Sequence, residues 1–169
     1  MLRHLLIADD HPICVAALTL AAHGVDSAIV VETAETIAEV EGLLRRKAFD
    51  LVLLDLRLRD SEGLGNLTLA LAAQPRTPIV VVSSNDGAAT IARADALGAR
   101  GFLSKAAGLE EMRLAIATVI DGGSWFPATR GALGDDAAPV DAAGETTDRL
   151  TPAQIRVANE LVKGHSNKI

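Results

Sequence analysis

The sequence has few of the residues that build disulfide-rich or aromatic-rich proteins. Cys14 is the only cysteine among 169 residues, so neither an intrachain disulfide nor a cysteine metal cage can form. It lies in an apolar helical pattern and is interpreted as a small core residue. Aromatic residues make up 2% of the chain, yet 49% of residues are hydrophobic. Such a chain can bury a core and is too apolar to be disordered.

Long uninterrupted hydrophobic runs are also missing. Charged residues interrupt every apolar run before it reaches the length of a membrane span. The first ten residues, MLRHLLIADD, contain too short an apolar run for a signal peptide. We therefore expect a cytoplasmic protein without a membrane partner.

The net charge of −6 is unevenly distributed. Residues 1–126 carry 11 basic and 16 acidic residues, whereas residues 127–148 carry one arginine and five acidic residues. Residues 149–169 carry four basic residues and one acidic residue. An acidic body with a basic tail indicates two functions. The segment 127–148 has almost no large apolar residue, which predicts a flexible linker.

Apolar runs alternate with helical patterns over the first 126 residues. The predicted strands are 2–8, 27–32, 49–55, 79–82 and 101–105. The predicted helices are 12–24, 33–47, 64–73, 86–97 and 109–120. Gly24 is the predicted C-cap of the first helix, and residues 60–63 are predicted to form a turn. Five strands alternating with five helices predict an α/β fold with a doubly wound parallel sheet.

Right-handed crossovers would place the carboxyl ends of the strands along one edge of that sheet. Those ends carry Asp9 and Asp10, then Asp55, Ser83 and Lys105. Each pair of crowded carboxylates repels by roughly 4 kcal/mol at about 4 Å and an effective dielectric near 20. A hard divalent cation is therefore the natural partner, and oxygen ligands suit Mg²⁺. Beside such a cation, a carboxylate can act as a nucleophile towards phosphorus, and Asp55 is the predicted reactive group.

The stretches IADDHP, LVLLDLRL, VVVSS and GARGFLSK resemble, in this order, the signature of response-regulator receiver domains. The resemblance covers residues 1–126 and is closest to the NarL/FixJ subfamily, in which Asp-Asp-His-Pro after the first strand is typical. It implies a CheY-like, flavodoxin-like (βα)5 receiver in which a histidine kinase phosphorylates Asp55. It also implies that Asp9, Asp10 and Asp55 bind Mg²⁺ together with the backbone carbonyl of Arg57.

The resemblance implies further roles at the same edge. Ser83 and Lys105 would sense the phosphoryl group, and Phe102 would be the aromatic switch. Arg57 and Asn85 would tune how fast the phosphoryl group is hydrolysed.

Three nearby residues need separate interpretation. His11 is interpreted as a positioning or surface residue and not as a ligand. Arg59 stands where receivers usually have proline, which is expected to loosen that turn. Ala106 follows Lys105 where many receivers have proline, and the isomer of this peptide bond is left open.

Residues 149–169 resemble the opening of a LuxR-type helix-turn-helix domain. Thr151 is a suitable N-cap and Pro152 a suitable first-turn residue. The recognition helix that would enter the major groove is absent from the sequence, so this region is expected to be an incomplete all-α fragment. Direct DNA binding by this sequence is not expected. DNA would be bound only through the full-length helix-turn-helix domain.

The predicted function is that of a response regulator in a two-component phosphorelay. Phosphorylation would change its conformation, promote a homodimer and control transcription. Asp55 would carry the phosphoryl group without turning over a substrate, so the chain is not predicted to be an enzyme. Two alternatives are a receiver fold that accepts no phosphate and an aspartate-based phosphohydrolase. The latter places its nucleophile after the first strand in an Asp-x-Asp pattern, unlike the adjacent Asp9 and Asp10.

Overall fold

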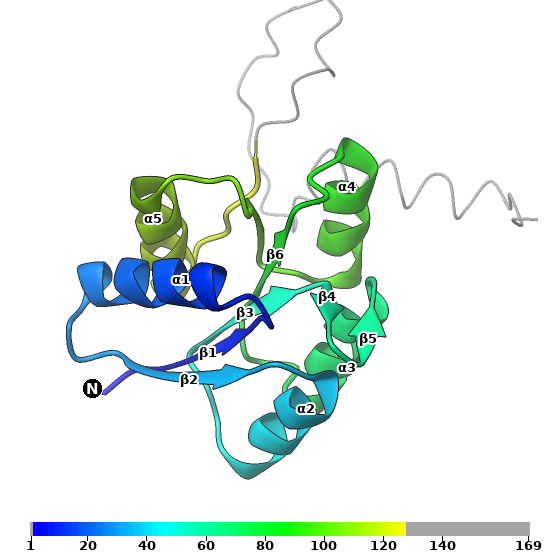
Figure 1. Ribbon diagram of the computed structural model, residues 1–169, viewed down its shortest axis with the longest axis horizontal. Helices are drawn as coiled ribbons and strands as arrows, with labels where there is room; N and C mark the ends of the chain where they lie inside the picture. The colour runs from blue at the N-terminus through cyan, green and yellow to red at the C-terminus, as the bar shows by residue number, and fades with distance from the viewer. Residues whose placement is uncertain (1, 128–169) are drawn as a thin grey trace, which may run out of the picture.

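A parallel sheet lies at the centre of the computed structural model, which describes residues 2–127 (Figure 1). Its strands are β1 (His4–Ala8), β2 (Val30–Ala34), β3 (Leu51–Asp55), β6 (Ile79–Ser83) and β7 (Gly101–Ser104). Their order is β2-β1-β3-β6-β7, and every neighbouring pair is parallel. The central strands β3 and β6 are buried along their whole length, as continuous apolar runs predict. The expected doubly wound sheet is confirmed.

Helices cover both faces of this sheet (Figure 1). One face packs against α1 (Pro12–Val25) and α5 (Leu109–Ile120), and the other against α2 (Ile37–Arg46), α3 (Gly65–Ala73) and α4 (Ala88–Leu97). Successive strand residues supply the two cores in turn, because their side chains point to opposite faces. In β3, Leu51 and Leu53 join one core, whereas Val52 and Leu54 join the other.

The predicted second strand is displaced in the structure. It begins at Val30, because the backbone N–H of Ala28 donates to Asp26 Oδ1 at 2.9 Å and holds the chain in a turn. It continues to Ala34, which pairs with Ala8 of β1. The β-branched pattern marked the strand but not its register against the neighbouring strand.

The predicted C-cap at Gly24 is wrong. Helix α1 continues to Val25, and the backbone N–H of Asp26 closes it by donating to Ala22 O at 3.1 Å. Gly24 lies inside the helix, where a Cβ would stand 3.4 Å from the Arg113 side chain of α5. A Cβ at this distance would make ordinary van der Waals contact with that side chain.

Helix α2 begins at Ile37, four residues after the predicted start. Its N-cap is Thr36, whose side chain accepts from the backbone N–H of Glu39 at 3.2 Å. Asp60 supplies a second cap, since its Oδ1 accepts from the backbone N–H of Ile37 at 2.8 Å. The hydrogen bond from Ile37 to the Asp60 carboxylate holds the pKa of Asp60 below its usual value. The sequence contained no signal for a cap from 23 residues away.

The predicted turn over residues 60–63 is part of a short hairpin. Its strands are β4 (Arg57–Leu58) and β5 (Ser61–Glu62), which pair antiparallel. Arg59 anchors this hairpin, because its Nη1 lies 2.6 Å from Glu35 Oε2 and its backbone N–H donates to Glu35 O at 3.2 Å. These contacts hold the turn to Glu35, and the looser turn expected from the missing proline stays a prediction.

Trp125 closes the β7 edge of the sheet. Its carbonyl accepts from the N–H of Phe102 at 2.7 Å, and its own N–H donates to Arg100 O at 3.1 Å. Gly101 permits this approach, since a Cβ there would stand 2.6 Å from the Trp125 carbonyl oxygen.

The remaining sequence-based points concern the C-terminal region, membrane-spanning helices and the Lys105–Ala106 peptide bond. Apart from residue 127, the predicted linker over 127–148 lies outside the described residues, as does the predicted helix-turn-helix fragment over 149–169. Among residues 2–127, no helix is both long enough and apolar enough to cross a membrane. No peptide bond in this range is cis, so the Lys105–Ala106 bond is trans.

Candidate functional site

The carboxyl ends of β1, β3, β6 and β7 meet at one edge of the sheet and bring the predicted site residues together. Asp9 follows β1, Asp55 ends β3, Ser83 ends β6 and Lys105 follows β7. Asp9 is 2% exposed and Asp55 is 3% exposed. Buried carboxylates are costly unless a cation or hydrogen bonds stabilise them, so the partners of these two groups decide what the site can do.

Lys105 joins the two buried carboxylates. Its Nζ lies 2.6 Å from Asp55 Oδ2 and 2.9 Å from Asp9 Oδ2. The Lys105 side chain is 14% exposed, so little water screens these ion pairs. The residue that the resemblance placed beside the reactive carboxylate is therefore in direct contact with it.

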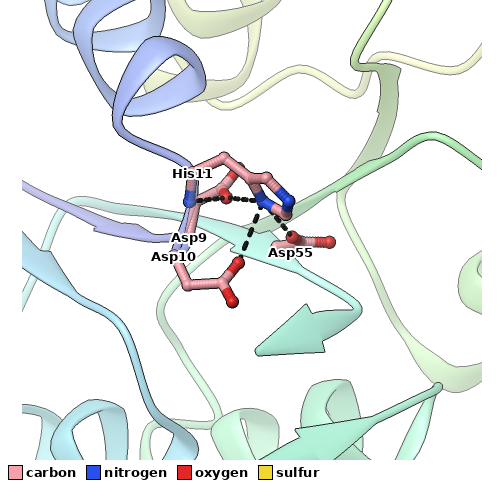
Figure 2. Close-up of side chains that lie close together, drawn as sticks. All are labelled: Asp9, Asp10, His11 and Asp55. Atoms are coloured by element: carbon pink, nitrogen blue, oxygen red, sulfur yellow. Dashed lines mark hydrogen bonds and ion pairs between the residues drawn. The ribbon is translucent and has the colours of Figure 1, made fainter. Parts of the chain in front are cut away.

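Asp10 and His11 complete a cluster around Asp55 (Figure 2). His11 Nδ1 lies 2.9 Å from Oδ1 of Asp9 and 2.9 Å from Oδ1 of Asp10. The same nitrogen lies 3.8 Å from Asp55 Oδ2. One ligand atom from each of these four residues lies within 4.8 Å of all the others. This arrangement has the dimensions of a cation site.

The pKa values of the three most buried charges are shifted in different directions. Burial raises the pKa of Asp55, and the nearby Asp9 adds to that rise, so that the Lys105 contact does not reverse it. Burial also acts to raise the pKa of Asp9, but hydrogen bonds from Cys14, Lys105 and His11 outweigh it and lower that pKa. Burial acts to lower the pKa of Lys105, yet its contacts with Asp55 and Asp9 raise it. Lys105 is thus stabilised as a cation.

The oxygen atoms at this edge suit a divalent cation. Within residues 2–127, Oδ2 of Asp9 and Oδ1 of Asp10 are buried without a well-directed hydrogen bond, and each has an ion-pair contact at 2.9 Å, with Lys105 Nζ and with His11 Nδ1 respectively. A buried carboxylate oxygen without such a partner is unfavourable. Mg²⁺ prefers carboxylate and carbonyl oxygens, so the donor set fits this ion. The backbone N–H of Arg57 donates to Asp55 Oδ1 at 3.0 Å, which places the Arg57 peptide beside the same carboxylate.

A cleft of about 500 Å³ opens beside Asp55. Arg57 and Asn85, the residues predicted to tune hydrolysis, both line it. The Arg57 side chain is exposed, and its Nη2 donates to Glu62 Oε1 at 2.9 Å. Thr90 and Arg93 of α4 also line the cleft, although neither was predicted as a site residue. Their only signal is the i, i+3 spacing that puts two helical residues on one face.

The two remaining predicted residues are buried. Ser83 is 6% exposed, and its Oγ accepts from the backbone N–H of Asn85 at 3.1 Å. Phe102 is fully buried in the core that also contains Ile91 and Ala94 of α4. Their roles as phosphate sensor and aromatic switch remain predictions.

This chain belongs to the family of response regulator receiver domains, whose sequence pattern matches residues 5–117. It is 30% identical over 171 residues to the glycerol metabolism activator of Pseudomonas putida, an alignment that covers 97% of this chain and 77% of that protein. The receiver resemblance found in the sequence is confirmed.

Solved structures with the same fold include two response regulators. The LuxR family DNA-binding response regulator from Silicibacter pomeroyi has a TM-score of 0.65 and 28% identity, over 76% of this chain and 98% of that one. A response regulator from Burkholderia pseudomallei, with a phosphorylated aspartic acid, a calcium ion and citrate, has a TM-score of 0.59 and 26% identity. That similarity covers 70% of this chain and 69% of the other.

Proposed function

We propose that this chain is a NarL/FixJ-type response regulator that accepts a phosphoryl group on Asp55 from a histidine kinase. The observation that carries the proposal is the buried Asp55 carboxylate, whose Oδ2 lies 2.6 Å from Lys105 Nζ at the end of β3. The burial of Asp55 beside Asp9 and Lys105 gives it an environment unlike that of an ordinary surface carboxylate. The phosphorylated aspartic acid in the related Burkholderia pseudomallei structure is consistent with this chemistry.

The chemistry requires one bond to form and one to break. An oxygen of Asp55 attacks the phosphorus atom of the kinase phosphohistidine, and the bond between phosphorus and the imidazole nitrogen breaks. Asp9, Asp10, Asp55 and the carbonyl of Arg57 would hold Mg²⁺, which supplies positive charge against the phosphoryl oxygens. Lys105 adds an ammonium on the same side, because it already contacts Asp55. The negative charge that develops on the phosphoryl group is thereby stabilised.

Asp55 acts here as a carrier and not as a catalyst with a turnover substrate. The phosphoryl group stays until water hydrolyses the acyl phosphate. Arg57 and Asn85 line the cleft through which that water approaches, and we assign the phosphate lifetime to these two residues.

Phosphorylation would change the balance between two conformations that both exist beforehand. The phosphoryl group adds about −1.5 to −2 charge, which draws in Ser83 and Lys105, while Phe102 responds at β7. The proposed outcome is a homodimer that controls transcription in the cytoplasm. We propose that residues 149–169 belong to the LuxR-type helix-turn-helix domain through which DNA would be bound. The related LuxR family protein is a DNA-binding response regulator.

Labelling with a small phosphodonor tests the proposal. The wild-type chain, incubated with the donor and Mg²⁺, should gain the mass of one phosphoryl group. Asp55→Asn should gain none, because an amide oxygen is a poor nucleophile. Asp50→Asn is the matched control, since Asp50 lies just before β3 but is exposed, and its Oδ2 accepts from the backbone N–H of His4 at 2.7 Å. Labelling that persists in Asp55→Asn, or disappears in Asp50→Asn, would move the acceptor elsewhere.

A further inference from the structure

His11 lies over the carboxylates, although its side chain remains 58% exposed to solvent (Figure 2). Its Nδ1 is 2.9 Å from one oxygen of Asp9 and 2.9 Å from one oxygen of Asp10. Lys105 Nζ lies 3.2 Å from the same nitrogen. The sequence favoured a positioning or surface role for His11, and these distances favour a direct role in the site.

The contacts of His11 Nδ1 cannot all be hydrogen bonds at the same time. An imidazole nitrogen carries either one proton or one lone pair. With a proton it could donate to Asp9 or to Asp10, but the Lys105 ammonium would then face another donor. With a lone pair it could accept from Lys105, but it would then face two carboxylate oxygens without a proton. A metal cation removes the conflict between the nitrogen and the carboxylates, because the nitrogen and the oxygens can all donate their lone pairs to it, while Lys105 keeps its contacts with Asp55 and Asp9.

The distances also fit neighbouring ligands around one ion. Metal–ligand bonds of about 2.1 Å at right angles put adjacent ligand atoms about 3.0 Å apart, close to the two distances of 2.9 Å from His11 Nδ1. A second observation is independent of His11. In the described part of the chain, Oδ2 of Asp9 is buried without a well-directed hydrogen bond, although Lys105 Nζ forms an ion pair with it at 2.9 Å, and Asp9 as a whole is 2% exposed.

We propose that His11 is a metal ligand through Nδ1, together with Asp9, Asp10 and Asp55. An imidazole nitrogen suits Ni²⁺, Zn²⁺ and other first-row transition cations, whereas Mg²⁺ prefers oxygen ligands. His11 therefore makes the site selective for a transition cation, which competes with Mg²⁺ for the same three carboxylates. This inference rests on the metal site of the proposed function and adds a ligand and a selectivity to it.

Calorimetric titration with Ni²⁺ and with Mg²⁺ tests the proposal on the full chain without a histidine tag. We expect Ni²⁺ to bind more tightly than Mg²⁺. His11→Ala should weaken Ni²⁺ binding by about tenfold or more, since even outer-shell changes cost about 10- to 100-fold, and should change Mg²⁺ binding by less than about twofold. His23→Ala is the matched control, because His23 Nε2 lies 3.2 Å from Ile29 O at the other end of α1.

A second variant separates ligation from folding. His11 is the N-cap residue of α1, and asparagine is a good N-cap, so His11→Asn should preserve the helix and still lose Ni²⁺ affinity. Unchanged Ni²⁺ affinity in both variants would overturn the proposal, as would an equal loss for Ni²⁺ and Mg²⁺. Wild-type protein that binds neither ion would refute the metal site of the proposed function as well. Asp10→Asn should weaken the binding of both ions.

Discussion

Lys105→Met is the perturbation whose outcome depends most directly on the geometry of the site. It leaves Asp9 and Asp55 buried without the ammonium that lies 2.9 and 2.6 Å from them. At an effective dielectric near 20, each of these contacts represents a gross attraction of roughly 6 kcal/mol. Removing the buried cation also removes the cost of desolvating it. The expected net loss in the free energy of unfolding is about 3–5 kcal/mol, as for other broken buried ion pairs.

Urea unfolding at pH 7 without divalent cations measures this loss, with the fluorescence of Trp125, the single tryptophan, as the signal. Lys47→Met is the matched control. Lys47 is ion-paired with Glu32, but both side chains are 32% exposed, so its loss should cost about 1 kcal/mol or less. Equal losses in the two variants would refute the reasoning, because the carboxylates beside Lys105 would then be as well solvated as Glu32.

The pH dependence of this loss has a defined sign. The pKa of Lys105 is raised above 10.5, so its contribution to stability is present below pH 10.5 and is lost as pH rises through the shifted value. The pKa of Asp9 is lowered below 3.8, so its contribution is present above pH 3.8 and is lost as pH falls through the shifted value. The deficit of Lys105→Met should therefore be largest between these limits and shrink at both ends.

The double variant Asp55→Asn, Lys105→Met tests whether the buried, ionised Asp55 destabilises the fold once the Lys105 ammonium is removed. The pKa of Asp55 is raised above 3.8, so stability is greatest below pH 3.8 and is lost as pH rises and Asp55 ionises. At pH 7 the double variant should be more stable than Lys105→Met alone. A double variant that is no more stable would show that the ionised Asp55 is not destabilising.

Two further predictions concern side chains away from the reactive edge. The Gln74 amide donates to Leu44 O at 2.6 Å and accepts from the backbone N–H of Phe49 at 3.3 Å. Gln74→Ala should therefore lower the free energy of unfolding by about 1–3 kcal/mol, measured with urea. A loss below about 0.5 kcal/mol, on the order of that for an exposed contact, would contradict this prediction. Burial and the neighbouring Asp9 raise the pKa of Cys14 from 9.0 to about 12. Because only the thiolate reacts, alkylation at pH 8 should be about 10²- to 10³-fold slower in the folded than in the unfolded chain. Equal rates would refute the raised pKa of this half-buried thiol.

Some elements could be predicted from the sequence because the signals that form them are local. Strand β6 was expected over residues 79–82 and spans Ile79–Ser83, since a β-branched run after a proline has few other conformations. Helix α4 ends at Leu97 as predicted, because Gly98 adopts a φ of 106° that closes it. Strand β2 was misplaced, because an edge strand of mixed polarity takes its register from its partner β1.

By itself the sequence determined the order of strands and helices and the identity of the residues at the strand ends. Asp9, Asp55 and Lys105 could be named because apolar runs end at them, and the period of an apolar pattern depends only on neighbours in the chain. Only the tertiary structure decided that one ammonium joins Asp55 to Asp9 and that His11 covers both carboxylates. Those contacts depend on how crossovers bring together residues far apart in the chain and on the burial that follows. No local pattern encodes a distance across the sheet.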